Sequence, residues 1–251
     1  MSIWALSDLH LAFGVPSKTM EEFGPSWHQY AEKIEANWRK MIAPDDLVLI
    51  PGDISWAVGL EEALIDLQWI DALPGTKVIL RGNHDYWWSS ASKLAKVMPP
   101  SIRFIHNNAI EWNDVSIGGS RLWDTPEYRF EDFIVFQPNP RARVKTPEEL
   151  AHEKEEEERI FVRELERLKL SLSKMNPNAA LKIAMTHYPP IGSDLAPTRA
   201  SQILEEFHID VCVFGHLHNV KPNSLSFGSA RGVKYLFTSC DYLHFIPVKV
   251  R

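Results

Sequence analysis

The chain is poor in cysteine, with only Cys212 and Cys240 among 251 residues. A disulfide framework is therefore excluded as the basis of the fold. Because ten histidines stand against these two cysteines, we expect any metal chemistry to use imidazole and oxygen ligands. Long hydrophobic runs are also missing, since none approaches the roughly 18 residues that a membrane-spanning helix needs. No basic leader precedes Asp8, so we expect a soluble, cytoplasmic protein without a membrane partner.

An excess of basic residues is missing as well. Lysine and arginine number 27 against 33 aspartate and glutamate residues, which gives a formal net charge of −6. Proteins that bind nucleic-acid polymers usually carry a basic excess, so we do not expect such a polymer as the partner. The hydrophobic share of 45% and the charged share of 24% are those of an ordinary globular protein.

Short apolar runs recur along the chain, and each ends in polar or glycine-rich residues. Runs of four to six residues that are apolar on both faces are typical of buried strands. The predicted strands cover residues 2–7, 46–51, 77–80, 103–106, 115–118, 181–186, 210–214, 234–238 and 245–250. Apolar residues at three- and four-residue spacings predict helices over residues 27–42 and 60–70. This alternation of strands and helices predicts a layered α/β fold.

Residues 123–146 interrupt the alternation with aromatic side chains set among prolines and charges. The aromatic residues are Trp123, Tyr128, Phe130, Phe133 and Phe136. An acidic helix is predicted next, with Leu150, Phe161, Leu165, Leu168 and Leu172 on its apolar side. Without an internal repeat or a marked change in composition, we expect one domain over residues 1–251 with an insertion at about 123–176. One hypothesis makes the aromatic segment a wall of the substrate cleft, and the other makes it a packing surface or the contact of a homo-oligomer.

Polar residues follow five of the predicted strands. They are Asp8-Leu9-His10, Gly52-Asp53, Gly82-Asn83-His84-Asp85, His187 and Gly215-His216-Leu217-His218. In open α/β sheets ligands bind at the carboxyl ends of the strands, so we expect one shared site. On an extended segment residues two apart point the same way, which predicts that Asp8 and His10 both face the site. The glycines of these clusters are expected to let the backbone turn sharply beside the ligands.

The mixture of side chains in these clusters indicates metal chemistry. Carboxylate, imidazole and amide donors without thiolates suit Mn²⁺, Fe or Zn²⁺. One ion rarely needs so many donors, whereas two divalent metal ions about 3.5–4 Å apart, sharing a carboxylate, would use nearly all of them. We therefore predict two divalent metal ions per chain.

The order Asp-x-His, Gly-Asp, Gly-Asn-His-Asp, His and Gly-His-x-His resembles the calcineurin-like metallophosphoesterases, and the resemblance spans Asp8 to His218. It implies a four-layer α/β-β/α sandwich in which helices flank two mixed sheets. It assigns Asp8, His10 and His218 to the first metal, Asn83, His187 and His216 to the second, and Asp53 to a bridge between them. It also makes His84 the catalytic histidine and Asp85 its orienting partner.

The resemblance implies hydrolysis of a small phosphodiester by a hydroxide that bridges two metals. Gly52-Asp53-Ile54-Ser55 lacks the arginine that protein phosphatases of this superfamily carry after Gly-Asp, which argues against a protein substrate. His187-Tyr188-Pro189-Pro190 is similar to the bacterial phosphodiesterase branch. A phosphomonoesterase, a nuclease of the same superfamily and a non-catalytic binding module remain as alternatives.

Three arginines lie near the ends of predicted strands or helices. Two are candidates for contact with substrate, and one is expected to be structural. Arg121 follows the fifth predicted strand, and Arg199 stands at a predicted helix start, so both are candidates for contact with substrate. Arg81 directly precedes Gly82 and is expected to be a structural ion-pair partner.

Overall fold

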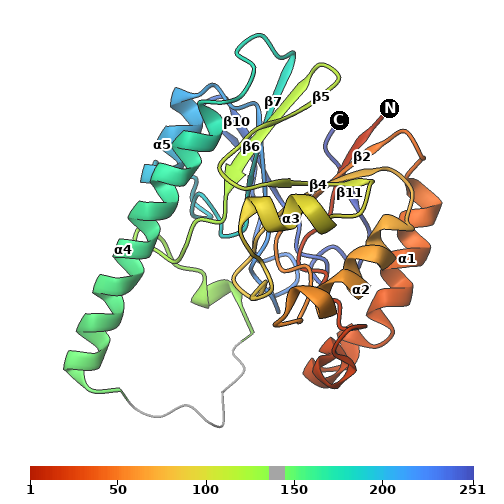
Figure 1. The fold of residues 1–251 in the computed structure, drawn as a ribbon. Coiled ribbons are helices and arrows are strands. Elements are labelled where there is room, and N and C mark those ends of the chain that lie inside the picture. The colour runs from red at the N-terminus through yellow and green to blue at the C-terminus, as the bar shows by residue number, and fades with distance from the viewer. Residues whose placement is uncertain (136–144) are drawn as a thin grey trace.

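The apolar strands assemble into two β-sheets that lie face to face, with helices on the outer face of each sheet (Figure 1). The structure is a computed structural model that describes residues 1–135 and 145–251. Its layers follow one another as helices, sheet, sheet and helices. The four-layer sandwich predicted from the resemblance is confirmed.

The first sheet has the strand order β11-β1-β2-β3-β4. Strands β1 to β4 are parallel to one another, and β11 pairs with β1 in the antiparallel sense. The strands are β1 (Ile3–Ala5), β2 (Leu47–Pro51), β3 (Thr76–Leu80), β4 (Ile102–Ile105) and β11 (Val248–Lys249).

The second sheet has the strand order β5-β6-β7-β8-β10-β9. Its four inner strands are parallel, and the edge strands β5 and β9 are antiparallel to their neighbours. The strands are β5 (Ile110–Trp112), β6 (Val115–Ser120), β7 (Leu181–Thr186), β8 (Val211–Phe214), β9 (Ser229–Ala230) and β10 (Val233–Phe237). Both sheets are therefore mixed, as predicted.

Helices cover the outer faces of the sheets. The α-helices are α1 (Tyr30–Met41), α2 (Leu60–Asp71), α3 (Ala91–Val97), α4 (Pro147–Leu172) and α5 (Arg199–Glu206). The short 3-10 helices are η1 (Pro16–Lys18), η2 (Met20–Phe23), η3 (Pro25–Trp27) and η4 (Glu131–Phe133). The first three α-helices pack on the first sheet, and the last two pack on the second. In the part of the chain that the structure describes, no helix is long and apolar enough to cross a membrane.

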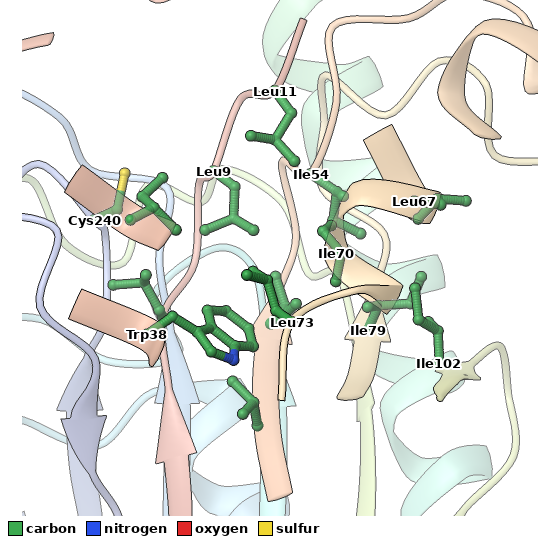
Figure 2. Close-up of a cluster of buried hydrophobic side chains, with 14 of the residues drawn as sticks. Leu9, Leu11, Trp38, Ile54, Leu67, Ile70, Leu73, Ile79, Ile102 and Cys240 are labelled. Atoms are coloured by element: carbon green, nitrogen blue, oxygen red, sulfur yellow. The ribbon is translucent and has the colours of Figure 1, made fainter. Parts of the chain in front are cut away.

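Alternation along the strands explains why they read as continuous apolar runs. In β2, Leu47 and Leu49 pack between the two sheets, whereas Val48 and Ile50 pack beneath the helices of the first sheet. Successive side chains of a strand point to opposite faces, so a strand buried on both faces is apolar at most positions. Figure 2 shows the helix-side layer of the first sheet, in which Trp38 of α1 is fully buried.

The predicted insertion packs against the second sheet's helical layer. Phe130 is buried there, and Trp123, Tyr128 and Phe133 pack partly against the same cluster. Phe136 lies outside the described residues. The described part of the aromatic segment therefore packs on the body of the protein.

Helix α4 confirms the predicted acidic helix with one exception. Phe161, Leu165, Leu168 and Leu172 are buried along its second half, but Leu150 in its first half is exposed. Figure 1 shows the reason: the first half of α4 extends away from the two sheets. Each predicted strand corresponds to a strand of the structure, whereas β5, β9 and α3 were not predicted.

Candidate metal centre

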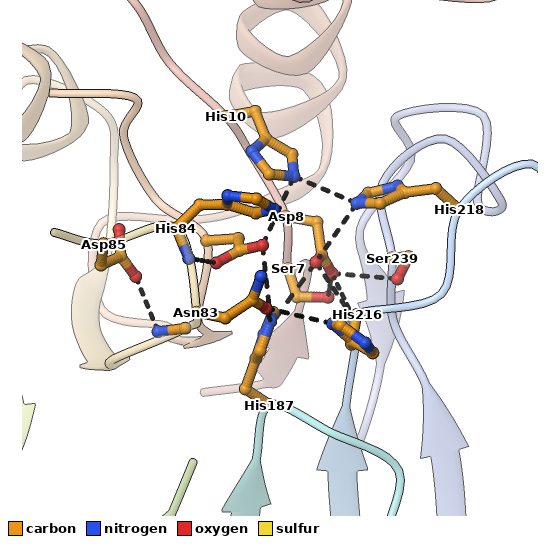
Figure 3. A network of polar contacts seen from close by, with 12 residues as sticks. Ser7, Asp8, His10, Asn83, His84, Asp85, His187, His216, His218 and Ser239 are labelled. Atoms are coloured by element: carbon orange, nitrogen blue, oxygen red, sulfur yellow. Dashed lines mark hydrogen bonds and ion pairs between the residues drawn. The ribbon is translucent and has the colours of Figure 1, made fainter. Parts of the chain in front are cut away.

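The polar ends of β1, β2, β3, β7 and β8 meet at one edge of the sandwich (Figure 3). The seven residues predicted as metal ligands all lie there, and they come from both sheets. Parallel strands present their carboxyl ends at a common edge, so clusters far apart in sequence become neighbours. The site is therefore a product of the two sheets together.

Four of these side chains form the first donor group. Single ligand atoms of Asp8, His10, Asp53 and His218 all lie within 4.8 Å of one another. The Nε2 atoms of His10 and His218 face each other at 3.0 Å, and His218 Nε2 lies 3.6 Å from Asp8 Oδ1. Two imidazole nitrogens directed at the same point beside carboxylates suit a shared cation. This grouping agrees with the first metal set that the resemblance implies.

The second donor group is built around Asn83. Its Oδ1 atom lies 2.7 Å from His187 Nε2 and 3.1 Å from His216 Nδ1. Asp53 connects the two groups, because its Oδ2 atom is 3.4 Å from His187 Nε2 and 3.6 Å from His10 Nε2. A carboxylate between two donor groups occupies the position expected of a bridging ligand.

Hydrogen bonds on the far side of two rings direct their other nitrogens into the site. His187 Nδ1 lies 3.0 Å from the carbonyl oxygen of Pro51, and His218 Nδ1 lies 3.0 Å from Asp241 Oδ1. A ring that donates from Nδ1 to an oxygen keeps the Nε2 lone pair for a cation, which is the usual arrangement for metal-binding histidines. The chemistry of the donor set therefore fits divalent metal ions.

Protonation differs among the four histidine rings of the site. Burial lowers the pKa of His10 to about 3 and lowers the pKa of His216 well below its usual value, so both rings are neutral. Burial also opposes the charge of His187 and His218, but Asp53 and Asp241 outweigh it and raise both pKa values to about 9. Metal ligation needs the neutral ring, so a cation would have to displace these protons.

The backbone at the ligands is not extended, and that part of the spacing argument is wrong. Asp8, His10 and His216 have φ values of 60°, 46° and 75°, in the left-handed region. The loop after β1 folds against the loop after β2, where His10 N–H donates to the carbonyl of Asp53 at 2.9 Å. These tight loops, rather than a strand period, direct the side chains into the site.

Two glycines leave room for the ligand carboxylates. A Cβ at Gly82 would lie 2.1 Å from Asp53 Oδ1, and a Cβ at Gly215 would lie 2.1 Å from Asp8 Oδ2. The predicted reason, a sharp turn, applies to Gly52 with its φ of 96°. At Gly82 and Gly215 the reason is close approach instead.

His84 lies at the site, but Asp85 does not orient it. The His84 N–H donates to Asp53 Oδ1 at 2.8 Å, and its ring packs against Trp56 with centroids 4.5 Å apart. The Asp85 carboxylate accepts instead from the Gly82 N–H at 2.7 Å and from the Ile54 N–H at 2.9 Å. Among the described residues, His84 Nδ1 has no hydrogen-bond partner.

The predicted partnership of His84 and Asp85 is therefore corrected, because loop amide groups occupy the carboxylate. Burial lowers the pKa of His84. Burial, with the charge of Asp53, raises the pKa of Asp85 to about 6. Asp85 ties the loop after β2 to the loop after β3, which holds Asp53 and Asn83 at their positions.

Sequence reasoning missed three side chains that support the ligands. Ser7 and Ser239 donate hydrogen bonds to Asp8 Oδ2, the latter at 2.9 Å. Asp241 accepts from both His218 Nδ1 and the Asn219 N–H. Ser239 and Asp241 follow β10, so the rule that found the other clusters, polar residues at the end of a buried strand, also finds these.

The structure does not bring the arginines to the donor groups. Arg199 opens α5 as predicted, but its guanidinium pairs with Glu127 and Glu158, so it is not presented to a substrate at the donor groups. Arg121 lies 3.5 Å from Glu164 and stacks over Trp123. Arg81 makes no ion pair within the described ranges, so the prediction of a structural ion pair is wrong for it.

A layered α/β sandwich with carboxylate and imidazole donors at its strand ends defines a metallophosphoesterase type of protein. The chain matches the calcineurin-like phosphoesterase family over residues 1–220 and belongs to that family. The predicted family is thus confirmed and, at the level of the family, so is the predicted class of hydrolase of phosphoric esters.

The similarity to individual known proteins is limited in sequence. The Gene 66 protein of Mycobacterium phage D29 is 31% identical over 84 residues, and the chain covers only 40% of the length of this curated relative. The phosphopantetheinyl hydrolase of Mycobacterium tuberculosis superimposes with a TM-score of 0.54 and 13% identity, over 99% of this chain and 95% of that one. A protein of unknown function from Aquifex aeolicus gives a TM-score of 0.48 and 16% identity over the same shares.

Proposed function

We propose that this protein is a metal-dependent phosphodiesterase that hydrolyses a small phosphodiester at two divalent metal ions. The observation that carries the proposal is the position of Asp53 between the two donor groups, 3.6 Å from His10 Nε2 and 3.4 Å from His187 Nε2. A pair of divalent ions held there would neutralise phosphate oxygens and lower the pKa of the attacking water. Mn²⁺, Fe and Zn²⁺ all suit the donors.

His84 is the group best placed to act on the phosphate or on the leaving oxygen. Its backbone is fixed to Asp53, and its ring packs against both Trp56 and His10 of the first donor group. Because burial lowers the pKa of His84, the ring is neutral near pH 7 and keeps one N–H to donate. That N–H can stabilise developing charge, and the ring can protonate the leaving oxygen only after it has taken up a second proton.

A cleft beside His216 offers space for a small organic substituent on the phosphate. The cleft has a volume of about 470 Å³, and Trp123, Tyr128, Phe130 and Tyr188 line it. Tyr128 donates its hydroxyl hydrogen to the carbonyl of Pro189, which ties the aromatic segment to the loop that carries His187. Aromatic walls close to a ligand are typical of pockets for small molecules. This arrangement favours the hypothesis that the aromatic segment forms one wall of the substrate cleft.

The diagnostic experiment is a panel of esters, each assayed with Mn²⁺, Zn²⁺ and Fe²⁺. Bis-p-nitrophenyl phosphate and cyclic nucleotides should be hydrolysed faster than p-nitrophenyl phosphate. The reverse order would favour a phosphomonoesterase, and cleavage of plasmid or oligonucleotide DNA would favour a nuclease. Two bound metals without turnover of any ester would favour the non-catalytic alternative.

The wall hypothesis has its own test. One variant replaces residues 126–144 with a short Gly/Ser linker, and residues 136–144 of this range lie outside the described residues. The variant should keep hydrolysis of small generic esters and change the preference among larger ones. Trp123→Ala should shift the same preference, whereas Phe23→Ala, an exposed aromatic outside the cleft, should not. A change in oligomeric state with an unchanged preference would contradict the wall and support a dimer contact.

The cytoplasmic location stays a prediction.

A further inference from the structure

A second pocket opens on the same edge of the sandwich, further along from the metal centre. The metal centre uses the ends of β1, β2, β3, β7 and β8, whereas this pocket lies between the ends of β3, β4 and β6 and the side of α4. Its volume is about 140 Å³, well above the ~10–15 Å³ that accommodates one water molecule. A small polyatomic ion fits this space, but a nucleoside does not.

The lining of this pocket is strongly basic in an acidic protein. Arg81, Arg121 and Arg167 face one carboxylate, Glu164, so positive charges exceed negative ones by two. The Glu164 side chain is buried and lies 2.7 Å from Arg167 and 3.5 Å from Arg121. The whole chain carries a net charge of −6, so this local excess is not a general property of its surface.

No ion pair or hydrogen bond among the described residues accounts for the position of the Arg81 side chain. In residues 1–135 and 145–251 it has no ion-pair partner, and its Nε atom is buried without a hydrogen-bond acceptor. A buried donor left without an acceptor is unfavourable. Glu164 is already shared by Arg121 and Arg167, and the described lining of the pocket holds no second carboxylate for the guanidinium group of Arg81.

Other lining groups also offer hydrogen-bond donors. His106 Nδ1 accepts from the Trp88 indole at 3.1 Å, so the neutral ring carries its hydrogen on Nε2. Planar guanidinium groups from two strand ends and a helix can contact three oxygens of one ligand at once. A carboxylate has two oxygens in one plane, whereas a phosphoryl or sulfate group presents oxygens in several directions. The pocket therefore suits a tetrahedral oxyanion.

Backbone connections link this pocket to the metal centre. Arg81 stands two residues before Asn83, and the carbonyl of Arg121 accepts from the His187 N–H at 3.2 Å. We infer that the pocket binds a second phosphoryl group of the substrate while the scissile ester lies at the metal centre. The inference rests on the proposed function for the identity of the substrate, but the oxyanion pocket itself does not require catalysis.

Binding of a free oxyanion tests the pocket without an activity assay. Equilibrium dialysis of labelled sulfate should show one site on the full-length, metal-loaded protein, with affinity at least about tenfold weaker in Arg81→Gln. Arg39→Gln, which removes an exposed arginine paired with Glu35 on α1, should bind sulfate like the wild type. Asp53→Ala, which disables the metal centre, should retain the site. No sulfate binding, or equal binding by Arg81→Gln and wild type, would overturn the inference.

Selenate soaked into crystals gives an independent readout that does not depend on affinity. Anomalous density should lie among the side chains of Arg81, Arg121 and Arg167. Density only at the metal centre would overturn the pocket assignment even if the dialysis showed one bound ion.

Kinetics distinguish a phosphoryl group of the substrate from a free anion. Thymidylyl-thymidine with a 5′-phosphate should have a KM about tenfold lower than the same dinucleotide without it, and Arg81→Gln should abolish this ratio. An unchanged KM, together with an effect of sulfate on kcat for both dinucleotides, would overturn the substrate assignment in favour of a free effector. Failure to hydrolyse either dinucleotide or any ester of the panel would count against the proposed function, while the dialysis would still decide the pocket.

Discussion

Asp241→Asn removes a charge behind a predicted metal ligand without changing the shape of the side chain. The two oxygens of Asp241 accept from His218 Nδ1 and from the Asn219 N–H, both at 3.0 Å. An asparagine has one carbonyl oxygen, so its amide group must face one of these two donors. The substitution therefore removes one hydrogen bond and the negative charge that makes the His218 ring more basic.

The expected loss follows from that contact. Substitution of a group that orients a metal-binding histidine typically lowers metal affinity by about 10–100-fold, or ~1.4–2.7 kcal/mol. Only the first donor group, which contains His218, should be weakened to this extent. Asn83 and His187, in the second group, keep their contacts with each other at 2.7 Å.

Metal content measured against graded chelator provides the assay. A wild-type centre that holds two metals should lose them at two chelator concentrations, and Asp241→Asn should lose one of them about 10–100-fold earlier. Asp114→Asn is the matched control, because Asp114 forms an exposed pair with Arg251. Equal retention of both metals in Asp241→Asn and the control would refute the role of Asp241, provided that thermal unfolding shows both variants folded.

Three further predictions concern the bridge, the catalytic histidine and a buried lysine. Asp53→Ala should lose bound metal and activity together but keep its fold, as seen by metal analysis and circular dichroism. A variant with two metals and near-normal turnover would remove the dinuclear assignment. His84→Ala should keep its metals while turnover falls by roughly 10²–10⁴, less for p-nitrophenyl esters whose leaving group barely needs a proton. Equal losses for good and poor leaving groups would show that His84 only stabilises charge. Burial lowers the pKa of Lys77 to about 8 from 10.5, so between these pH values the unfolded chain binds the extra proton. The stability of the wild type relative to Lys77→Met should therefore rise with pH across this window, by about 1–3 kcal/mol in urea unfolding, and parallel pH profiles would contradict the assignment.

The sequence by itself determined the layered fold and the edge at which the candidate ligands meet. Strands such as β2 are buried on both faces, so every position is apolar, and that pattern is visible without coordinates. Each ligand cluster follows such a strand, and parallel strands must end at a common edge. Asp8, Asp53 and His187 could therefore be assigned to one site from their place in the chain alone.

Contacts between loops were decided only by the tertiary structure. Asp85 stands beside His84 in sequence, but its carboxylate binds the amide groups of Gly82 and Ile54. The direction of a side chain in a loop depends on backbone angles, and the left-handed residues Asp8 and His10 do not follow a strand period.

Partners from distant strands and helices were likewise beyond the sequence. Asp241 supports His218 because β10 lies beside β8, and Arg199 is occupied because α4 places Glu158 next to it. The basic pocket around Arg81 forms where the two sheets and α4 pack together, and no residue spacing along the chain predicts that packing. A pattern of residues specifies which face of an element is buried, whereas the partner of each polar group depends on how separate elements pack in space.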